Sequence, residues 1–440
     1  MSGLRERMNR LRGASPQSSA AEDEAENRPL QDSDRLKPSE EEPEDRLSGE
    51  WSRMQVRTAA NDWGSFLLRE VFYPLDYQHG THRLMELIDA SAALSAFHRG
   101  SEETPAPSAY NMLFLDLETT GLGVGTGNVP FMVGLGYATF DRFVIEQSLI
   151  RHPAEERAML AYLAEKLKNF DYLVTYNGRT FDWPVLAGRY IMNGLGRLDS
   201  RLLHLDFLHP SRSIWRNTLT SCKLSHIEEE RLNIKRHDDV PGSLAPSIYF
   251  QYLADGDPAP LEGVFRHNEI DMLSLACLAI RFAHLLGGRL GIDVPYPEDQ
   301  EELLRTGLWL DKMGLTDLAE TLFARLADKD VPTGSWCLPL AARDKKVGNW
   351  ERAVLLWQKI ALSAEASALP SYEAHIELAM YNEHRSKDLP SALRYAESAM
   401  QLALRRPQSR RNDPKLRAEL EAIANRLERL RRKQNKGNVN

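Results

Sequence analysis

The strongest constraint on the fold is a short apolar run within residues 111–121 that ends in two acidic residues. Residues 112–115 have the apolar character of a buried strand, and Asp116 and Glu118 follow at its end. Because side chains alternate along a strand, we expect both carboxylates on one face, about 6–7 Å apart. Such carboxylates repel each other, and a divalent metal ion between them would compensate their charge. A solvated strand end is the alternative, because Asp-x-Glu alone is common.

The composition indicates a soluble protein of several domains. A chain of 440 residues is too long for one hydrophobic core, so we expect two or three domains. No apolar run approaches the ~18 residues of a transmembrane helix, and no secretory signal is recognised, so we expect no membrane association. The three cysteines are scattered singly, which argues against disulfides or a zinc site and fits a cytoplasmic location. With a net charge of −8, any contact with nucleic acid must come from local patches or through metal ions.

The chain divides into four segments. Residues 1–50 are rich in Ser, Pro, Asp and Glu, so they cannot bury enough surface to fold and we expect a disordered acidic tail. Aromatic residues return in 51–108, which we interpret as a small extension and a linker. Residues 109–290 alternate between strand and helix patterns, and residues 298–433 are Ala- and Leu-rich and helical.

The last segment contains an internal repeat. A pattern of two small residues and an aromatic residue recurs at an offset of 34 residues: Gly307, Ala319 and Phe323, then Ala341, Ala353 and Trp357. A looser copy follows from Ala379. This period is typical of tetratricopeptide helical pairs, so we expect an all-α repeat domain there that binds a protein partner.

The segment 109–290 has the pattern of an α/β fold. After the first strand, we expect strands at 131–140 and 142–150, a helix at 154–170 and a strand at 172–176. The Gly-rich link at 121–127 could be read as a phosphate cradle, but it lacks the Lys-Ser/Thr of a P-loop. We interpret it as a turn.

Two further acidic residues follow strands of this segment. The strand ending near Tyr176 leads into a loop and helix that carry Asp182, and a short run at 202–205 ends in Asp206. Because ligands of α/β sheets gather at the carboxyl ends of strands, both acids are expected near Asp116.

A long helix expected at 261–286 carries a second set of polar residues. His267 and Asp271 are four residues apart and therefore share one helix face, and Asn268 is adjacent to His267. The helix thus offers an acid and an imidazole to the same site.

Three motifs in this order resemble the DEDD superfamily of 3′→5′ exonucleases, which have the ribonuclease H-like fold. They read Phe-Leu-Asp-Leu-Glu-Thr-Thr-Gly, Tyr-Asn-Gly-Arg-Thr-Phe-Asp-Trp-Pro and His-Asn-Glu-Ile-Asp-Met-Leu-Ser-Leu. The stretches His-Leu-Asp-Phe-Leu and Asp-Val-Pro-Gly-Ser resemble the bacterial YprB-like group of that superfamily. The resemblance covers about residues 51–287. It implies a mixed sheet flanked by helices, followed by tetratricopeptide-like repeats.

The resemblance also implies a two-metal nuclease site. Asp116 would bridge or bind both ions, and Glu118, Asp182 and Asp271 would complete the ligand set. Two ions about 3.5–4 Å apart stabilise the attacking and leaving oxygens of phosphodiester hydrolysis. Oxygen ligands with open positions favour Mg²⁺ or Mn²⁺.

His267 would be the general base of such a site. In the histidine branch of the superfamily the base lies five positions before the last Asp, where this chain has Arg266. In the tyrosine branch it lies four before, the position of His267. Residues expected in supporting or substrate-binding roles are Thr119, Asn177, Phe181, Asp206 and Asn268.

The resulting hypothesis is a metal-dependent nuclease that removes nucleotides from 3′ ends of single-stranded DNA or RNA. An endonuclease using the same site is one alternative, because four acids do not fix substrate polarity. A catalytically weak or inactive nucleic-acid-binding module is a second alternative. A protein-interaction scaffold that uses the helical repeats is a third.

Overall fold

The computed structural model describes most of the chain beyond the N-terminal tail. It covers residues 49–99, 105–121, 123, 127–198, 201–328, 333–364, 371–405 and 414–437. The tail expected to be disordered, residues 1–50, lies outside this part except for its last two residues, which begin helix α2 (Gly49–Arg53). Most of the Gly-rich link at 121–127 also lies outside the described residues, so its turn stays a prediction.

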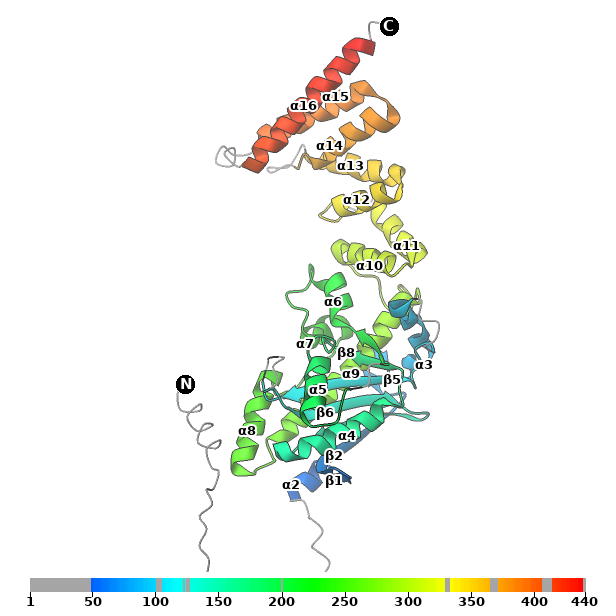
Figure 1. The fold of residues 1–440 in the computed structure, drawn as a ribbon. Coiled ribbons are helices and arrows are strands. Elements are labelled where there is room, and N and C mark those ends of the chain that lie inside the picture. The colour runs from blue at the N-terminus through cyan, green and yellow to red at the C-terminus, as the bar shows by residue number, and fades with distance from the viewer. Residues whose placement is uncertain are drawn as a thin grey trace, which may run out of the picture. The chain divides into compact units, whose positions relative to one another are not determined.

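The described residues form one mixed sheet of seven strands, in the order β1-β2-β7-β6-β5-β8-β9 (Figure 1). The strand bounds are β1 Val56–Asn61, β2 Gly64–Pro74, β5 Met112–Thr119, β6 Pro130–Ala138, β7 Arg142–Leu149, β8 Tyr172–Thr175 and β9 Leu203–Asp206. Strands β5, β8 and β9 are parallel to one another, and the remaining neighbours pair antiparallel. The mixed α/β fold expected from the sequence is confirmed.

The extension that precedes β5 is part of this sheet. Strand β2 pairs antiparallel with β7, from Leu67 opposite Leu149 to Pro74 opposite Arg142, and β1 pairs with β2. The segment 51–108 therefore adds two strands to one edge of the sheet.

Helices cover both faces of the sheet, and consecutive residues of β5 point alternately to these two faces. Leu113 and Leu115 pack in a core with helices α4 (Glu156–Leu167) and α5 (Asp182–Met192). Phe114 packs instead in the core that contains most of helix α9 (Leu261–Leu286). The α9 face is therefore the face toward which the alternation of β5 directs Asp116.

Shorter elements complete the α/β part. They are β3 Gln78–His79, β4 His82–Arg83, α3 Glu86–Ala90, η1 Ser91–His98, η2 Pro153–Glu155, α6 Leu208–Trp215, α7 Leu224–Ile227, η3 Glu228–Leu232, η4 Gly242–Leu244 and α8 Ala245–Asp255. Strands β3 and β4 form a separate two-stranded hairpin.

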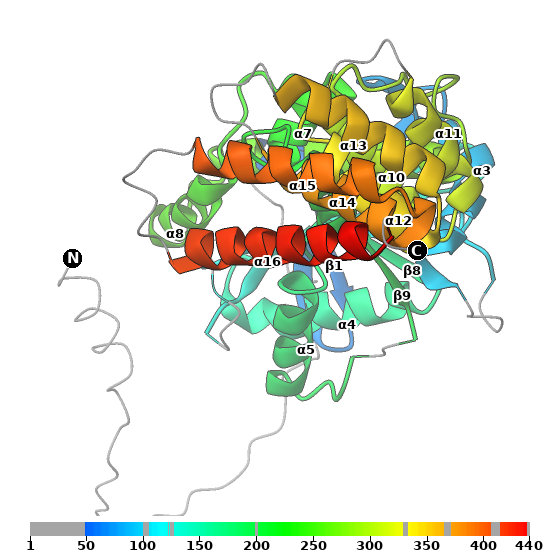
Figure 2. The ribbon, with the colours of Figure 1, turned by 90° about the horizontal axis from the view of Figure 1, so that it is seen from above.

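The C-terminal part is helical. Its described helices are α10 Gln300–Lys312, α11 Thr316–Ala327, α12 Cys337–Val347, α13 Trp350–Ala364, α14 Glu373–Tyr381, η5 Asn382–Ser386, α15 Leu389–Leu404 and α16 Pro414–Gly437. Successive helices pack as pairs, and Figure 2 shows α16 lying beside α15. A Cβ on Gly307 would lie 2.5 Å from Phe323, which explains why a small residue faces an aromatic one within the first pair.

The helical part and the α/β part share a hydrophobic core. Trp309 of α10 contacts Phe97 and Phe282, with ring centroids 6.1 and 5.5 Å away. The same buried cluster continues from Leu84 to Leu378. Among the described helices, none has the length and apolar character needed to cross a membrane.

Candidate active site

Asp116 and Glu118 lie near the carboxyl end of β5, in the middle of the sheet. Leu117 and Glu118 are buried, whereas Asp116 keeps partial exposure. Asp116 is opposite Gly134 of β6, and the pairing register shifts between Glu118 and Thr119. The two carboxylates therefore stand where regular pairing ends, next to the loop that follows β5.

Asp182 is the first residue of α5 and is only 5% exposed. The loop that carries it is held by Asp206 at the end of β9. The Asp206 carboxylate accepts hydrogen bonds from the backbone N–H groups of Asn177 (2.8 Å) and Arg179 (3.0 Å). Because β5 and β8 are parallel neighbours, this loop begins at the same sheet end as Asp116.

Helix α9 reaches Asp116 through Asn268, which is fully buried. The Asn268 amide donates from Nδ2 to Asp116 Oδ2 (3.0 Å), and its Oδ1 accepts from Gln147 Nε2 (2.9 Å). A Cβ on Gly134 would lie 2.1 Å from Asn268 Oδ1, so only glycine at 134 permits this approach of helix and strand.

His267 and Asp271 lie on the same face of α9, with Nε2 and Oδ2 3.6 Å apart. His267 Nδ1 lies 2.9 Å from both oxygens of Asp239. An Nδ1–H group donating to Asp239 would orient the ring so that Nε2 faces Asp271. Gly242 leaves room beside this nitrogen, since a Cβ there would lie 2.9 Å from Nε2.

Arg236 neutralises part of the acidic charge around Asp271. Its guanidinium donates to Asp271 and Asp239, and to both oxygens of the fully buried Glu228 at 2.6 Å. The guanidinium also lies 3.1 Å from His267 Nδ1. Arg236 thus fixes the α9 side of the site from the segment that follows η3.

The pKa values of three of these acids are raised, first by burial and then by neighbouring carboxylates. Burial and the charge of Asp271 raise the pKa of Asp116 to about 7. Burial and the charge of Asp116 raise the pKa values of Glu118 and Asp182 well above their ordinary range. The charges of His267 and Arg236 and the hydrogen bond from Asn268 oppose this effect on the pKa of Asp116. The ionised cluster is therefore short of positive charge.

The donor set fits a divalent cation. The four carboxylates offer oxygen ligands, which Mg²⁺ and Mn²⁺ prefer, and two of them are buried without a cation of their own in the described structure. A bound ion would supply the positive charge that this cluster lacks.

The structure brings the five principal predicted residues, Asp116, Glu118, Asp182, His267 and Asp271, to one end of the sheet. The other predicted residues hold the loops around them. Thr119 Oγ1 donates to the carbonyl of Gly121 (2.7 Å). Asn177 adopts a left-handed conformation (φ 71°), and its carbonyl accepts from the N–H of Phe181 (3.1 Å).

Sequence reasoning missed four residues of the site: Gln147, Glu228, Arg236 and Asp239. Asp239 belongs to a stretch that supports the family resemblance, so the motif marks it without giving its role. Gln147 lies inside an apolar strand, where one buried amide gives no signal of its partner.

Residues 113–283, which include all five principal residues, match the family described as the RNase_H superfamily. Together with the sheet order, this match defines a ribonuclease H-superfamily domain. The chain is also 34% identical over 358 residues to the uncharacterized protein YprB of Bacillus subtilis (strain 168). That alignment covers 80% of this chain and 84% of YprB. The chain therefore belongs to the YprB family.

Proposed function

We propose that the protein is a metal-dependent 3′→5′ exonuclease of the DEDD type that acts on single-stranded DNA or RNA. The observation that carries this proposal is that Asp116, Glu118 and Asp182 lie together at one end of the sheet, where burial and neighbouring carboxylates raise all three pKa values. Acids arranged at such a cost to their ionised forms are typical of a metal site. Two Mg²⁺ or Mn²⁺ ions held by these acids and Asp271 would stabilise the charge that develops in phosphodiester hydrolysis.

His267 accepts the proton of the attacking water at Nε2. Asp239 accepts from the opposite ring nitrogen, which orients the imidazole and stabilises the imidazolium that forms. Asn268 orients the Asp116 carboxylate, and Asp206 holds the loop that presents Asp182. The base and Asn268 thus come from α9, the orienting acid Asp239 from the segment between η3 and η4, and Asp206 from the end of β9.

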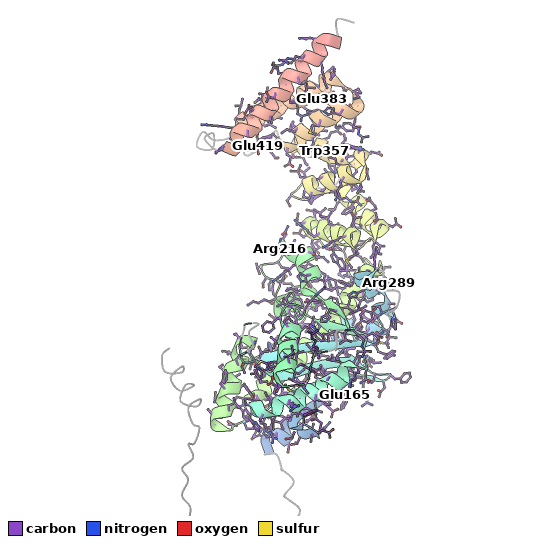
Figure 3. The ribbon with its side chains drawn as sticks, in the orientation of Figure 1. Glu165, Arg216, Arg289, Trp357, Glu383 and Glu419 are labelled. Carbon is purple, nitrogen blue, oxygen red and sulfur yellow. The ribbon has the colours of Figure 1, made fainter. Side chains whose placement is uncertain are left out.

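Exposed cations beside the site support nucleic acid as the substrate. Arg212 belongs to α6, and Arg216 follows its last residue (Figure 3). Both line two hollows of about 540 and 590 Å³. The first hollow also includes Asn177, from the loop that leads to Asp182. No ion pair involves either arginine in the part of the chain that the structure describes, so both guanidinium groups are available to phosphates.

The helical pairs beyond residue 298 are consistent with tetratricopeptide-like repeats that bind a protein partner. The pair α12–α13 places a helix with a small residue, Ala341, against a helix with an aromatic residue, Trp357. Stacked pairs of this kind form extended binding surfaces.

Degradation of single-stranded DNA and RNA tests the proposal. Substrates labelled at either the 5′ or the 3′ end are incubated with Mg²⁺, Mn²⁺ or EDTA. For wild type we expect a ladder of 5′-labelled products that shorten from the 3′ end, with no products in EDTA. Asp116→Asn and His267→Gln should each lower the rate at least about 100-fold.

A second candidate is a nucleic-acid-binding module without turnover. The observation that favours it is the ion pair between Arg236 and Asp271, because this pair occupies one of the four carboxylates that would bind metal. Binding of both labelled strands without cleavage under either metal would establish this candidate. Cleavage that survives Asp116→Asn would contradict both proposals, because the activity would then arise elsewhere.

A further inference from the structure

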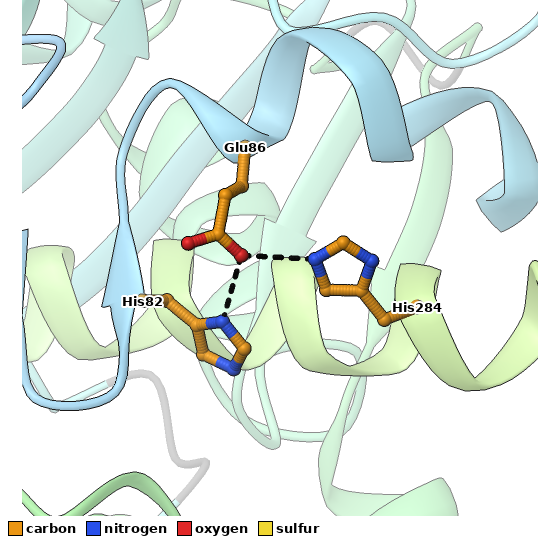
Figure 4. Close-up of side chains that lie close together, drawn as sticks. All are labelled: His82, Glu86 and His284. Carbon is orange, nitrogen blue, oxygen red and sulfur yellow. Dashed lines mark hydrogen bonds and ion pairs between the residues drawn. The ribbon is translucent and has the colours of Figure 1, made fainter. Parts of the chain in front are cut away.

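A second cluster of potential metal ligands lies outside the carboxylate site. His82 belongs to β4, Glu86 is the first residue of α3, and His284 lies in the last turn of α9. One ligand atom from each lies within 4.8 Å of the other two (Figure 4). The cluster thus joins the N-terminal extension to the far end of the helix that carries His267 and Asp271.

A single oxygen atom is shared by the two imidazoles. Glu86 Oε2 lies 3.0 Å from His82 Nδ1 and 2.9 Å from His284 Nε2 (Figure 4). Without a metal ion, both nitrogens must carry protons to make these contacts. The other nitrogen of His284, Nδ1, lies 3.6 Å from Asp293 Oδ2. Both ring nitrogens of His284 therefore face carboxylate oxygens.

The three ligand atoms lie close enough together to bind one cation. His284 would bind it through Nε2 and direct an Nδ1–H group toward Asp293. A metal-bound histidine is commonly oriented by a carboxylate in this way. His82 is 2% exposed, and its Nε2 has no hydrogen-bond partner among the described residues. The burial of this imidazole is therefore offset through Nδ1, the atom that would bind the ion.

The cluster is accessible from a hollow of about 460 Å³. Glu86, His284 and Asp293 line it, together with Asp89 and Arg289. Glu86 is 29% exposed on this side, while the imidazole of His284 is 10% exposed. The hollow gives an ion a route of entry and leaves room for a water molecule as a fourth ligand.

We propose that His82, Glu86 and His284 form a mononuclear site for Zn²⁺, separate from the carboxylate cluster. Two imidazoles and one carboxylate are a donor set of zinc sites, whereas Mg²⁺ prefers oxygen ligands alone. The bound ion holds the β3–β4 hairpin and α3 against the C-terminal turn of α9. This proposal is independent of the nuclease activity.

Metal binding to the full chain tests the site. The protein is treated with EDTA, dialysed and titrated with Zn²⁺ against a chromophoric chelator, and with Co²⁺ by visible absorption. We expect His82→Ala and His284→Ala each to bind one ion fewer than wild type, or to bind it about 100-fold or more weakly. Zn²⁺ should raise the Tm of wild type but not of either variant.

Three further proteins complete the experiment. His384→Ala removes an exposed imidazole of the helical part and should bind Zn²⁺ as wild type does. Glu86→Gln preserves the shape of the cluster if a histidine variant fails to fold, and it should show the same weakening. Asp116→Asn should retain this site, which separates the result from that of the nuclease assay. Equal stoichiometry and affinity in wild type, Glu86→Gln and both histidine variants would overturn the proposal, and so would the absence of Zn²⁺ binding.

Discussion

His267 depends for its orientation on Asp239, a residue 28 positions earlier in the chain. Asp239 lies 2.9 Å from Nδ1, which leaves Nε2 as the basic nitrogen. In Asp239→Asn the amide nitrogen can face Nδ1 and favour the wrong tautomer. We predict that Asp239→Asn lowers kcat about 10–100-fold with little change in KM, measured as initial rates across pH 5–9.

Asp238→Asn is the matched control for this prediction. Asp238 is the preceding residue, is exposed, and has a positive φ of 54° that asparagine tolerates. Its variant should keep the wild-type rate and pH profile. Equal losses in the two variants would show that the loop as a whole, rather than the Asp239–His267 contact, matters.

For individual residues, the sequence predicts the position of the acids better than the position of the residues that orient them. Strand alternation, the ends of parallel strands and the helical period of His267 and Asp271 are local rules, so the convergence of the acids could be predicted. Arg236 lies in an irregular segment between η3 and η4, where no period gives the direction of a side chain. Its pairing with Asp271 depends on tertiary packing, which a single sequence does not report.

Among the elements, the contact between β6 and α9 sets the position of Asn268. Gly134 stands opposite Asp116 in the sheet, and a Cβ there would lie 2.1 Å from Asn268 Oδ1. We predict that Gly134→Ala displaces the Asn268 amide, lowers the free energy of unfolding by about 1–3 kcal/mol and weakens nuclease activity. Urea unfolding and the cleavage assay measure the two effects.

Gly188→Ala provides the control in helix α5. A Cβ there would meet no other atom within 4 Å, so alanine should stabilise the helix by about 0.5–1 kcal/mol. The close approach of β6 and α9 would be disproved if Gly134→Ala were as stable and as active as Gly188→Ala.

The junction of η5 and α16 depends on Glu383 (Figure 3), whose side chain is buried. Burial raises the pKa of Glu383, but hydrogen bonds from Arg429 and Lys433 outweigh it and lower the pKa to about 2. The folded form therefore binds the proton less tightly than the unfolded form. This contribution to stability is complete above the ordinary pKa of 4.5 and is lost as the pH falls toward 2.

We predict that Glu383→Gln lowers the free energy of unfolding by about 1–2 kcal/mol at pH 7 and by much less at pH 2.5, in thermal unfolding. The expected loss is small because Arg429 and Lys433 are partly exposed and solvent screens their interaction with Glu383. Glu421→Gln replaces an exposed carboxylate of α16 and should change little at either pH. A loss in Glu383→Gln that was equal at both pH values would contradict the account.

In the whole molecule, Glu302 of α10 connects the helical part to the α/β part. It accepts hydrogen bonds from Trp215 Nε1 (2.9 Å) and from Arg231 (2.6 and 3.2 Å). Burial lowers the pKa of the nearby Arg281 to about 10, and the charge of Glu302 opposes that shift. Glu302 therefore compensates the buried Arg281 and the partly buried Arg231. Arg231 also lies 3.6 Å from Glu230.

We predict that Glu302→Gln destabilises the whole chain by about 3 kcal/mol, because the amide can still accept from Trp215 but no longer compensates Arg231 and Arg281. Since both parts share one core, far-UV circular dichroism and tryptophan fluorescence should report the same lowered midpoint in urea. Glu298→Gln, at an exposed position just before α10, should stay within about 0.5 kcal/mol of wild type. A lowered midpoint in tryptophan fluorescence, with an unchanged midpoint in circular dichroism, would show that the two parts unfold separately.

The shared core is also the feature that the sequence conveys least. Composition and the 34-residue period separate a helical segment from an α/β segment. They do not report that Trp309 packs against Phe97 and Phe282, because such contacts join residues far apart in the chain. The sequence predicts the number and type of elements well, and their packing across segments poorly.

The central claim is that Asp116, Glu118, Asp182 and Asp271 together bind divalent metal ions. It is tested most directly by counting bound Mn²⁺ through the electron paramagnetic resonance signal of the free ion. Wild type should bind about two more ions per chain than Asp116→Asn, and Asp62→Asn, which changes an exposed acid, should match wild type. Any Mn²⁺ at the His82–Glu86–His284 cluster is common to all three proteins and cancels in the comparison. Equal Mn²⁺ binding by wild type and Asp116→Asn would contradict the claim.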